Sequence, residues 1–339
     1  MSSFDFFLHL AGVALLALAL CSAILLALLK TGLASRLATD VPNDRSLHTR
    51  PVPRIGGWGI VPAVCVLIGA LASGLWMTAL LAALLALLSQ IDDRRGLPAR
   101  VRFAGHVAAV AALIVVYPAQ VPWWFLGGLG FALVWLVNLY NFMDGANGLA
   151  GGMALFGFGG YAVAATISIH ADPSLAMACA IVAGAASGFL LFNFNPARLF
   201  LGDVGSIPLG FLAGALGYWG WLRGVWPLWF PAMVFLPFIA DASVTLLKRL
   251  ARGEKFWQAH REHYYQRIIR SGISHSETAG IWYLGMASGV VIGCCALTLG
   301  LALQLTVVAL WCLVLVCAGL LVDRRWRLYV AHSENRSKA

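Results

Sequence analysis

The amino-acid sequence predicts an all-α integral membrane protein that crosses the bilayer about eleven times. Of its 339 residues, 61% are hydrophobic and 11% are charged, whereas soluble domains carry about 25% charged residues. Apolar runs recur along the whole chain, and a spanning helix needs about 20 apolar residues because its backbone groups must pair internally in lipid. This composition excludes an ordinary soluble domain.

Charged or Pro/Gly-rich breaks separate the apolar runs. We expect the first run to be retained as a span, because it is longer than the apolar core of a signal peptide and Lys30 follows it. The expected spans are residues 6–29, 57–73, 75–91, 103–118, 122–140, 148–168, 174–192, 205–220, 226–247, 278–298 and 301–321. They form one domain, residues 1–322, and the cytoplasmic tail 323–339 is expected to be a short interfacial helix that ends in disorder.

Basic residues indicate how the spans are oriented. If the N-terminus lies outside and the chain alternates, 22 of the 23 Lys and Arg residues fall on the inner side, with Arg223 as the exception. Because inner loops are enriched in Lys and Arg, we expect a periplasmic N-terminus and a cytoplasmic C-terminus. The same topology explains the net charge of +9 without a nucleic-acid partner. The seven cysteines lie in apolar runs without zinc-like spacing, so we expect packing roles for them.

The inner loops carry most of the polar residues. They comprise residues 30–56, 91–102, 138–147, 193–204 and 248–277, and they hold nearly all of the Asp, Asn, Arg and His residues. The outer connections are short and rich in Trp, as is typical of the aromatic belt at a membrane interface. Any chemistry is therefore expected on the cytoplasmic face.

Acidic residues mark the inner ends of two spans. Asp92 and Asp93 directly follow an apolar run, where adjacent carboxylates suit Mg²⁺ or a proton; a solvated helix end is the alternative. Asp241 lies inside the ninth apolar run. An ionisable residue within a span indicates function, although pairing with a neighbouring helix also explains it.

The run NLYNFMDGANGLAGG follows the fifth span. Steps of three place Asn138, Asn141 and Asp144 on one helical face as the chain leaves the membrane. Gly145 then allows close approach to a ligand, and Asn147 follows it. A polar turn between two helices is the alternative interpretation.

Two further loops complete the polar face. FNFNPARLFLGDVGS carries Asn193 and Asp203, and an Asp between loop and helix start fits a metal or phosphate site. The last inner loop carries His260, His263 and Arg267, which can donate to phosphate. Part of that loop's charge is the ordinary signal of an inner loop.

Taken together, carboxylates and a basic loop converge on one membrane face. Mg²⁺-dependent phosphoryl transfer requires this combination, because the metal neutralises phosphate oxygens while cations hold the diphosphate in line. A transporter or flippase for a phosphorylated lipid or nucleotide sugar is the alternative, but it would place charges near the midplane.

Five ordered motifs resemble those of one membrane enzyme family. The motifs are PNDRSLHTRPVPRIGGWGI (42–60), IDDRRG, NLYNFMDGANG, FNFNPARLFLGDVGS and HREHYYQR (260–267), and they cover almost the whole chain. They are similar to those of the polyprenyl-phosphate N-acetylhexosamine 1-phosphate transferases, glycosyltransferase family 4. The first and last motifs are similar to the initiators of O-antigen and common-antigen synthesis more than to the muramoyl-pentapeptide enzyme.

The resemblance implies both a reaction and a location. A UDP-N-acetylamino sugar from the cytoplasm and undecaprenyl phosphate from the bilayer would give undecaprenyl-diphospho-sugar and UMP, with Mg²⁺ or Mn²⁺ as cofactor. This reaction would initiate O-antigen or a related envelope polysaccharide at the bacterial inner membrane. A homodimer is plausible for the family, and the HxxHxYQR ending favours a 6-deoxy or otherwise modified sugar.

The resemblance also implies roles for individual residues. Asp203, Asp144 and Asp92 would ligate the metal, and Asp92 and Asp93 would handle the acceptor phosphate, as general base or through the metal. The residues implied to bind substrate are His48, Arg50, Arg54, Asn138, Asn141, Asn147, Asn193, Phe200 near the uracil, Asp241, His260, His263 and Arg267.

One position departs from the family pattern. Asn147 stands where the family commonly has a second Asp, and an amide brings no charge and can donate a hydrogen bond. The sequence leaves open whether the acceptor attacks directly or through a covalent Asp intermediate.

Overall fold

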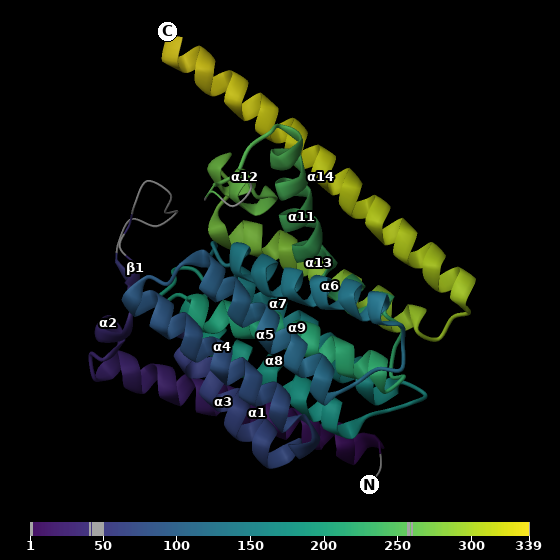
Figure 1. Cartoon of the computed structure of the whole chain (residues 1–339). Helices are drawn as coiled ribbons and strands as arrows, with labels where there is room; N and C mark the ends of the chain where they lie inside the picture. Colours follow the sequence, from purple (N-terminus) through teal and green to yellow (C-terminus); the bar gives the residue numbers. More distant parts are fainter. Residues whose placement is uncertain (1–2, 41, 43–50, 256–257, 259, 339) are drawn as a thin grey trace.

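In a computed structural model, which describes residues 3–40, 42, 51–255, 258 and 260–338, the chain is nearly all helix (Figure 1). The elements are α1 (Ser3–Lys30), α2 (Ala34–Leu37), β1 (Thr39–Asp40), β2 (Val52–Pro53), α3 (Gly56–Leu71), η1 (Ser73–Leu75), α4 (Trp76–Arg95), α5 (Ala99–Val116), α6 (Trp123–Phe142), α7 (Leu149–Ile167), α8 (Pro173–Asn193), α9 (Asp203–Leu222), α10 (Trp229–Val234), α11 (Leu236–Ala251), α12 (Tyr264–Arg270), α13 (His275–Ala296) and α14 (Leu301–Lys338). The two short strands pair antiparallel.

Many of these helices have the length and composition of membrane spans. Within the described ranges, eight are long and apolar enough to cross a bilayer: α1, α4, α5, α6, α7, α8, α13 and α14. Helix α3 is apolar but only 16 residues long. The chain is therefore a polytopic helical membrane protein, while the eleven crossings and the orientation of the termini stay predictions.

Helix α9 lies at the centre of the bundle. Every residue from Val204 to Tyr218 is buried, because small residues let neighbouring backbones come close. A Cβ atom on Gly57 of α3 would lie 2.3 Å from the backbone nitrogen of Gly205. Likewise, a Cβ on Gly184 of α8 would lie 2.1 Å from the carbonyl oxygen of Ala14 in α1. Such small-residue contacts are characteristic of helix packing in membranes.

The expected span 226–247 is wrong as a single helix. The structure divides it into α10 and α11 at Phe235, whose backbone angles depart from helical values (φ −95°, ψ 8°). Pro237 starts α11 and has no N–H to continue the hydrogen bonds of α10. As a result α11 stands at an angle to the bundle and rises toward α12 (Figure 1).

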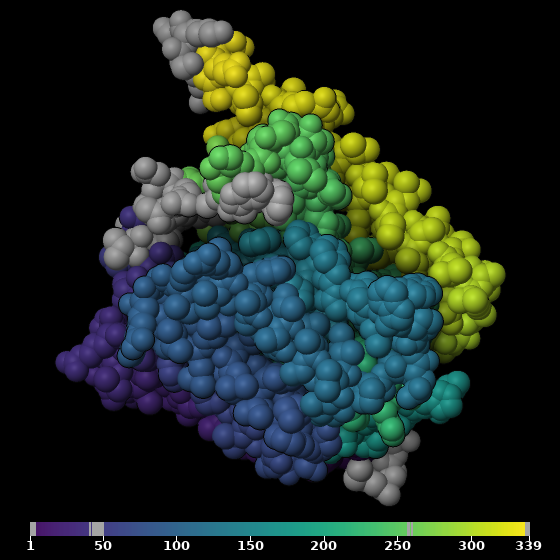
Figure 2. Space-filling view, viewed as in Figure 1, coloured from purple at the N-terminus to yellow at the C-terminus, as the bar shows by residue number. Residues whose placement is uncertain are grey.

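The C-terminal tail also differs from expectation. Instead of a break near Asp323, α14 continues as one helix of 38 residues to Lys338. No proline interrupts this stretch, and Leu, Arg and Ala favour helix. The helix runs along the side of the molecule and projects beyond it (Figure 2).

Candidate active site

The candidate site is built around Arg54, which bridges two carboxylates from helices that are far apart in the sequence. Its Nη2 atom lies 3.3 Å from Oδ1 of Asp93, at the end of α4, and 3.4 Å from Oδ1 of Asp203, at the start of α9. These two residues are 110 positions apart in the chain (203 − 93). The structure therefore brings together the second and fourth motifs around a residue of the first.

A short backbone pairing places Arg54 there. The N–H of Phe200 donates to the Pro53 carbonyl at 2.8 Å, and the N–H of Gly56 donates to the Phe200 carbonyl at 2.8 Å. Gly202 follows with φ +70°, a conformation that favours glycine, and it turns the chain into α9. Asp203 is thus the first residue of α9, where the helix dipole favours a negative charge.

The Asp144 loop joins this cluster from α6. Asn141 accepts a hydrogen bond from the Ser206 hydroxyl of α9 at 2.7 Å, which ties the end of α6 to the start of α9. Burial raises the pKa of Asp144 to about 7, and the charge of Asp203 adds to this effect. The Arg54 guanidinium and the Gly202 N–H act in the opposite direction. The positive charge of Arg54 therefore acts on the carboxylates of Asp93, Asp144 and Asp203.

The charge balance of this cluster is suited to a divalent cation. Arg54 faces the carboxylates of Asp93, Asp144 and Asp203, and in the described residues Oδ2 of Asp93 is buried without a hydrogen-bond partner. No group of three His, Cys, Asp or Glu side chains in the described ranges is close enough to hold an ion by itself. Mg²⁺ commonly uses only one or two carboxylates together with water and substrate phosphates. The residues present fit that mode of binding.

Asp92 differs from Asp93 although the two are adjacent. Its Oδ1 accepts the Leu97 N–H at 2.7 Å, and its Oδ2 lies 2.8 Å from Nη1 of Arg102. Both oxygens are therefore engaged in holding the start of α5 against α4. The contacts favour a scaffold role for Asp92, and the metal role implied for it is unsupported by them.

Three of the predicted asparagines pair with nearby backbone or loop atoms. Asn193 is buried, accepts the Gly148 N–H at 2.8 Å and donates to the Leu199 carbonyl at 2.9 Å. Asn147 donates to Oδ1 of Asn195 at 3.1 Å. Asn138 donates to the Val134 carbonyl of its own helix at 2.7 Å. Asn193 and Asn147 shape the loop beside the cluster, and Asn138 lies one turn further into α6.

Asp241 is turned away from the Arg54 cluster. It is only 4% exposed, and its two oxygens accept the backbone N–H groups of Tyr264 at 2.7 Å and Tyr265 at 3.1 Å. It thereby anchors the start of α12, which agrees with the alternative of pairing with a neighbouring helix, and the predicted contact with substrate stays a prediction. Tyr265 in turn reaches the Asp144 loop, where its hydroxyl donates to the Phe142 carbonyl at 3.4 Å.

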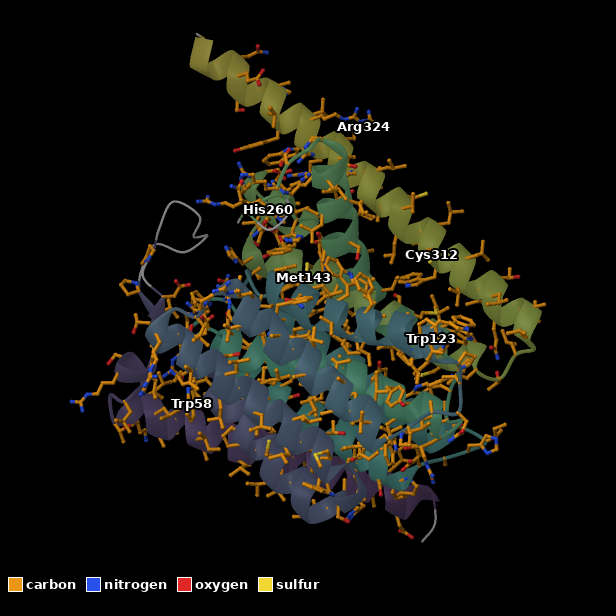
Figure 3. All side chains as sticks on the ribbon, in the orientation of Figure 1. Trp58, Trp123, Met143, His260, Cys312 and Arg324 are labelled. Carbon is orange, nitrogen blue, oxygen red and sulfur yellow. The ribbon has the colours of Figure 1, made fainter. Side chains whose placement is uncertain are left out.

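The histidines of the last loop lie on the same side as the Asp144 loop. His263 is buried, 3.5 Å from Asp241, and its ring stacks on Phe142 with the centroids 6.4 Å apart. The rings of His260 and His263 are 4.8 Å apart, and Figure 3 shows His260 above Met143. Partial burial lowers the pKa of His260 to about 4, helped by the charges of His263 and Arg249. Without a bound anion, His260 is therefore neutral near pH 7.

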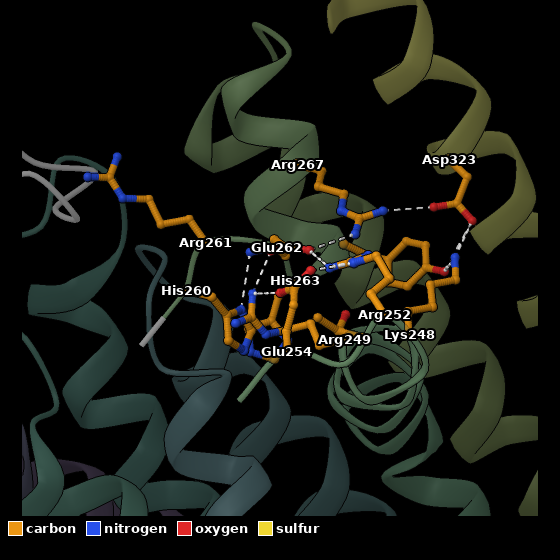
Figure 4. A network of polar contacts seen from close by, with 12 residues as sticks. Lys248, Arg249, Arg252, Glu254, His260, Arg261, Glu262, His263, Arg267 and Asp323 are labelled. Carbon is orange, nitrogen blue, oxygen red and sulfur yellow. Dashed lines mark hydrogen bonds and ion pairs between the residues drawn. The ribbon is translucent and has the colours of Figure 1, made fainter. Parts of the chain in front are cut away.

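Arg267 belongs to a separate network (Figure 4). It is 7% exposed, and its Nη1 lies 2.9 Å from Oδ1 of Asp323 on α14. Lys248 also pairs with Asp323, while Arg249 and Arg252 pair with Glu254 and Glu262. This ion pair ties α12 to α14, and the contact of Arg267 with the diphosphate stays a prediction.

Two predicted site residues, His48 and Arg50, lie outside the described residues. Other residues make contacts near the site that were not predicted. The roles of Arg102 and Asp323 were not predicted, because their partners depend on which helices pack together. Ser206 belongs to the FNFNPARLFLGDVGS motif and stands three residues after Asp203 on the same face of a helix, but its bond to Asn141 was not predicted.

Comparison with known proteins adds an independent observation. The profile of glycosyl transferase family 4 matches residues 75–220, which include the three motifs from α4 to α9. The chain is 32% identical over 302 residues to a decaprenyl-phosphate N-acetylglucosaminephosphotransferase of Mycobacterium tuberculosis, and 74% of each chain is covered. The chain belongs to the polyprenyl-phosphate N-acetylhexosamine 1-phosphate transferase family.

Other relatives of this sugar-1-phosphate transferase family agree. The chain is 29% identical over 270 residues to a probable undecaprenyl-phosphate N-acetylglucosaminyl 1-phosphate transferase of Bacillus subtilis, covering 73% of this chain and 74% of the relative. It is 25% identical over 316 residues to an undecaprenyl-phosphate alpha-N-acetylglucosaminyl 1-phosphate transferase of Yersinia pestis, covering 85% of both. The expected family is thus confirmed.

Proposed function

We propose that the protein transfers an N-acetylamino-sugar 1-phosphate from a UDP-sugar to undecaprenyl phosphate on the cytoplasmic face of the bacterial inner membrane. The observation that carries this proposal is the set of carboxylates around Arg54, which leaves negative charge for a cation beside the membrane. The names of three relatives include N-acetylglucosamine. UDP-N-acetylglucosamine is therefore the first donor to test, ahead of a 6-deoxy sugar. The product would begin O-antigen or another envelope polysaccharide.

Different residues would bind the metal and the phosphate groups during phosphoryl transfer. Asp203 and Asp144 would hold Mg²⁺ or Mn²⁺ together with the diphosphate of the donor. When bound, the ion would neutralise phosphate oxygens and so lower the barrier to attack. Arg54 would hold a phosphate group after exchanging its contacts with the carboxylates, because a guanidinium binds phosphate in a forked geometry.

Asp93 is the proposed proton acceptor. Its Oδ2 atom has no partner among the described residues and would take a proton from the acceptor phosphate once substrate binding exposes it. An oxygen of that phosphate would then bond to the sugar-bearing phosphorus of the donor. The bond from this phosphorus to the bridging oxygen breaks, and UMP leaves. Asn147 and Phe200 are proposed to lie near the nucleotide.

The test is release of UMP by the purified protein from a panel of UDP-N-acetylamino sugars with undecaprenyl phosphate. We expect turnover that needs the lipid, stops with EDTA and returns with Mg²⁺ or Mn²⁺. Movement of lipid or nucleotide sugar across liposomes without release of UMP would favour the transporter instead. Absence of turnover across the panel from folded protein would contradict the proposal.

A further inference from the structure

A cavity lies beside the cytoplasmic extension of α14, apart from the candidate active site. It has a volume of about 420 Å³ and is lined by Ser271, Leu321, Arg324, Arg325, Leu328, Tyr329 and His332. Ser271 follows α12, and the other six residues come from α14. The cavity is thus a groove between the α12–α13 turn and one side of the long C-terminal helix.

The α14 residues form a single stripe. Positions 321, 324, 325, 328, 329 and 332 are separated by three or four residues, or are neighbours within such a step, so they share one helical face. Arg327 lies on the same turn but does not line the cavity. Asp323 points elsewhere, to Lys248 and Arg267. Two arginines and a histidine therefore line the groove without a carboxylate.

The two arginines are held differently. Arg325 donates from Nε to the Ser271 hydroxyl at 2.8 Å and from Nη2 to the Ser271 carbonyl at 3.1 Å, which fixes its guanidinium at the wall. Arg324 makes no hydrogen bond or ion pair with any residue that the structure describes, and it projects from α14 (Figure 3). A basic group without a protein partner beside a fixed one can take up an anion.

The position of the groove along α14 indicates the source of that anion. Residues 301–322 are apolar apart from Gln304 and Thr306, and a helix of that length rises about 33 Å at about 1.5 Å per residue, close to the thickness of the hydrocarbon core. Arg324 therefore lies where lipid headgroups begin. Leu321 and Leu328, at 67% and 54% exposure, supply apolar surface on either side of it.

We propose that this groove binds the headgroup of an anionic phospholipid. The phosphodiester would lie between Arg324 and Arg325, with the glycerol backbone and upper acyl chain against Leu321 and Leu328. Tyr329 would contact the interface, as tyrosines do at membrane surfaces. General attraction between basic residues and an anionic membrane also predicts lipid binding. That attraction, however, would make the loss of Arg327 weaken lipid binding as much as the loss of Arg324.

The test uses that difference. Full-length protein in detergent is mixed with phosphatidylglycerol or phosphatidylcholine, and retained lipid is counted by native mass spectrometry. We expect selective retention of phosphatidylglycerol by the wild-type protein, a loss of at least fivefold in Arg324→Gln, and less than twofold change in Arg327→Gln. Thermal unfolding without added lipid is expected to be equal in the two variants, which separates loss of binding from loss of folding.

Several results would overturn the proposal. Equal loss in Arg324→Gln and Arg327→Gln would mean a diffuse charge effect, and equal retention of phosphatidylcholine would mean no recognition of charge. If glycerol phosphate alone displaced the bound lipid at similar concentration, the site would recognise a free phosphate. Preference for polyprenyl phosphate over phosphatidylglycerol would instead make the groove part of the acceptor route.

Discussion

Two polar regions on the same end of the molecule have opposite charge balance. Around Arg54, one cation faces the carboxylates of Asp93, Asp144 and Asp203. Around α12, Lys248, Arg249, Arg252 and Arg267 pair with Glu254, Glu262 and Asp323. The α12 network pairs each of its carboxylates with at least one cation, whereas the Arg54 cluster sets one guanidinium against three carboxylates.

This difference distinguishes the Arg54 cluster, as a candidate active site, from the α12 network, as a structural support. Grouping buried carboxylates is costly when few cations face them, so the Arg54 cluster is suited to receive a further cation or a proton. The ion pairs of the α12 network tie the last inner loop to α11 and α14. Sequence alone places both regions among candidate substrate contacts. The contacts favour chemistry at the Arg54 cluster and a supporting role for the α12 network, and both roles stay predictions.

The largest expected effect is on Asp203. We expect Asp203→Asn to lower turnover by about 100-fold or more, as loss of a charge that acts on the transition state does, while the protein still inserts and purifies normally. The matched control is Asp172→Asn at the start of α8, where Asn still caps the helix. UMP release measures both variants, and near-normal turnover in Asp203→Asn would remove the assigned metal role.

A substitution of Arg54 tests whether the carboxylates of the cluster bind a cation. Arg54→Gln removes the cation that neutralises the cluster, so Mn²⁺ should bind more tightly to the protein without substrate, by about tenfold for about 1.4 kcal/mol. Turnover should nevertheless fall, because a phosphate contact is lost. Isothermal titration with Mn²⁺ gives the affinity. Weaker binding in Arg54→Gln would show that the carboxylates do not form the cation site.

A substitution of Asp323 tests the supporting role of the α12 network. Asp323→Asn leaves Arg267 and Lys248 without their carboxylate, so we expect a loss of unfolding free energy of about 1–3 kcal/mol. Turnover should stay within about threefold of wild type, a small effect compared with that of Asp203, and the Mg²⁺ midpoint should not move. Thermal unfolding and Mg²⁺ titration measure these effects. A large shift in the Mg²⁺ midpoint would mean that the two regions are not separate.

The smallest expected effect concerns pH. The pKa of His260 is lowered to about 4, whereas an unfolded histidine has a pKa of about 6.5. As pH falls through this window the unfolded chain binds a proton before the folded protein does, so stability declines from about pH 6.5 to about pH 4. His260→Gln should flatten that decline in thermal unfolding; an unchanged slope would contradict the burial assigned to His260.

The sequence predicted helices better than contacts. Apolar runs fix most spans because lipid allows few alternatives to a helix. The break at Phe235, the length of α14 and the short elements α2, β1, β2 and α12 in the loops were not predicted. Asp93, Asp144 and Asp203 were predicted because each stands at the inner end of an apolar run.

Other features depended on packing that the sequence does not reveal. Asp92 and Asp93 look equivalent in sequence, but successive residues on a helix point about 100° apart, so only one faces Arg54. The partners of Asp241 and Arg267 are 23 and 56 residues away. No local pattern identifies pairs at such distances, so the sequence left these partners open and the family resemblance alone implied contacts with substrate.

The most direct test of the account is Mn²⁺ binding measured by electron paramagnetic resonance, with and without UDP-N-acetylglucosamine. We expect the wild-type protein to bind the ion more tightly in the presence of the nucleotide sugar. Asp203→Asn and Asp144→Asn should lose this binding, and Asp241→Asn and Asp323→Asn should retain it. Retained binding in Asp203→Asn and Asp144→Asn would contradict the assignment of the Arg54 cluster as the metal-dependent active site.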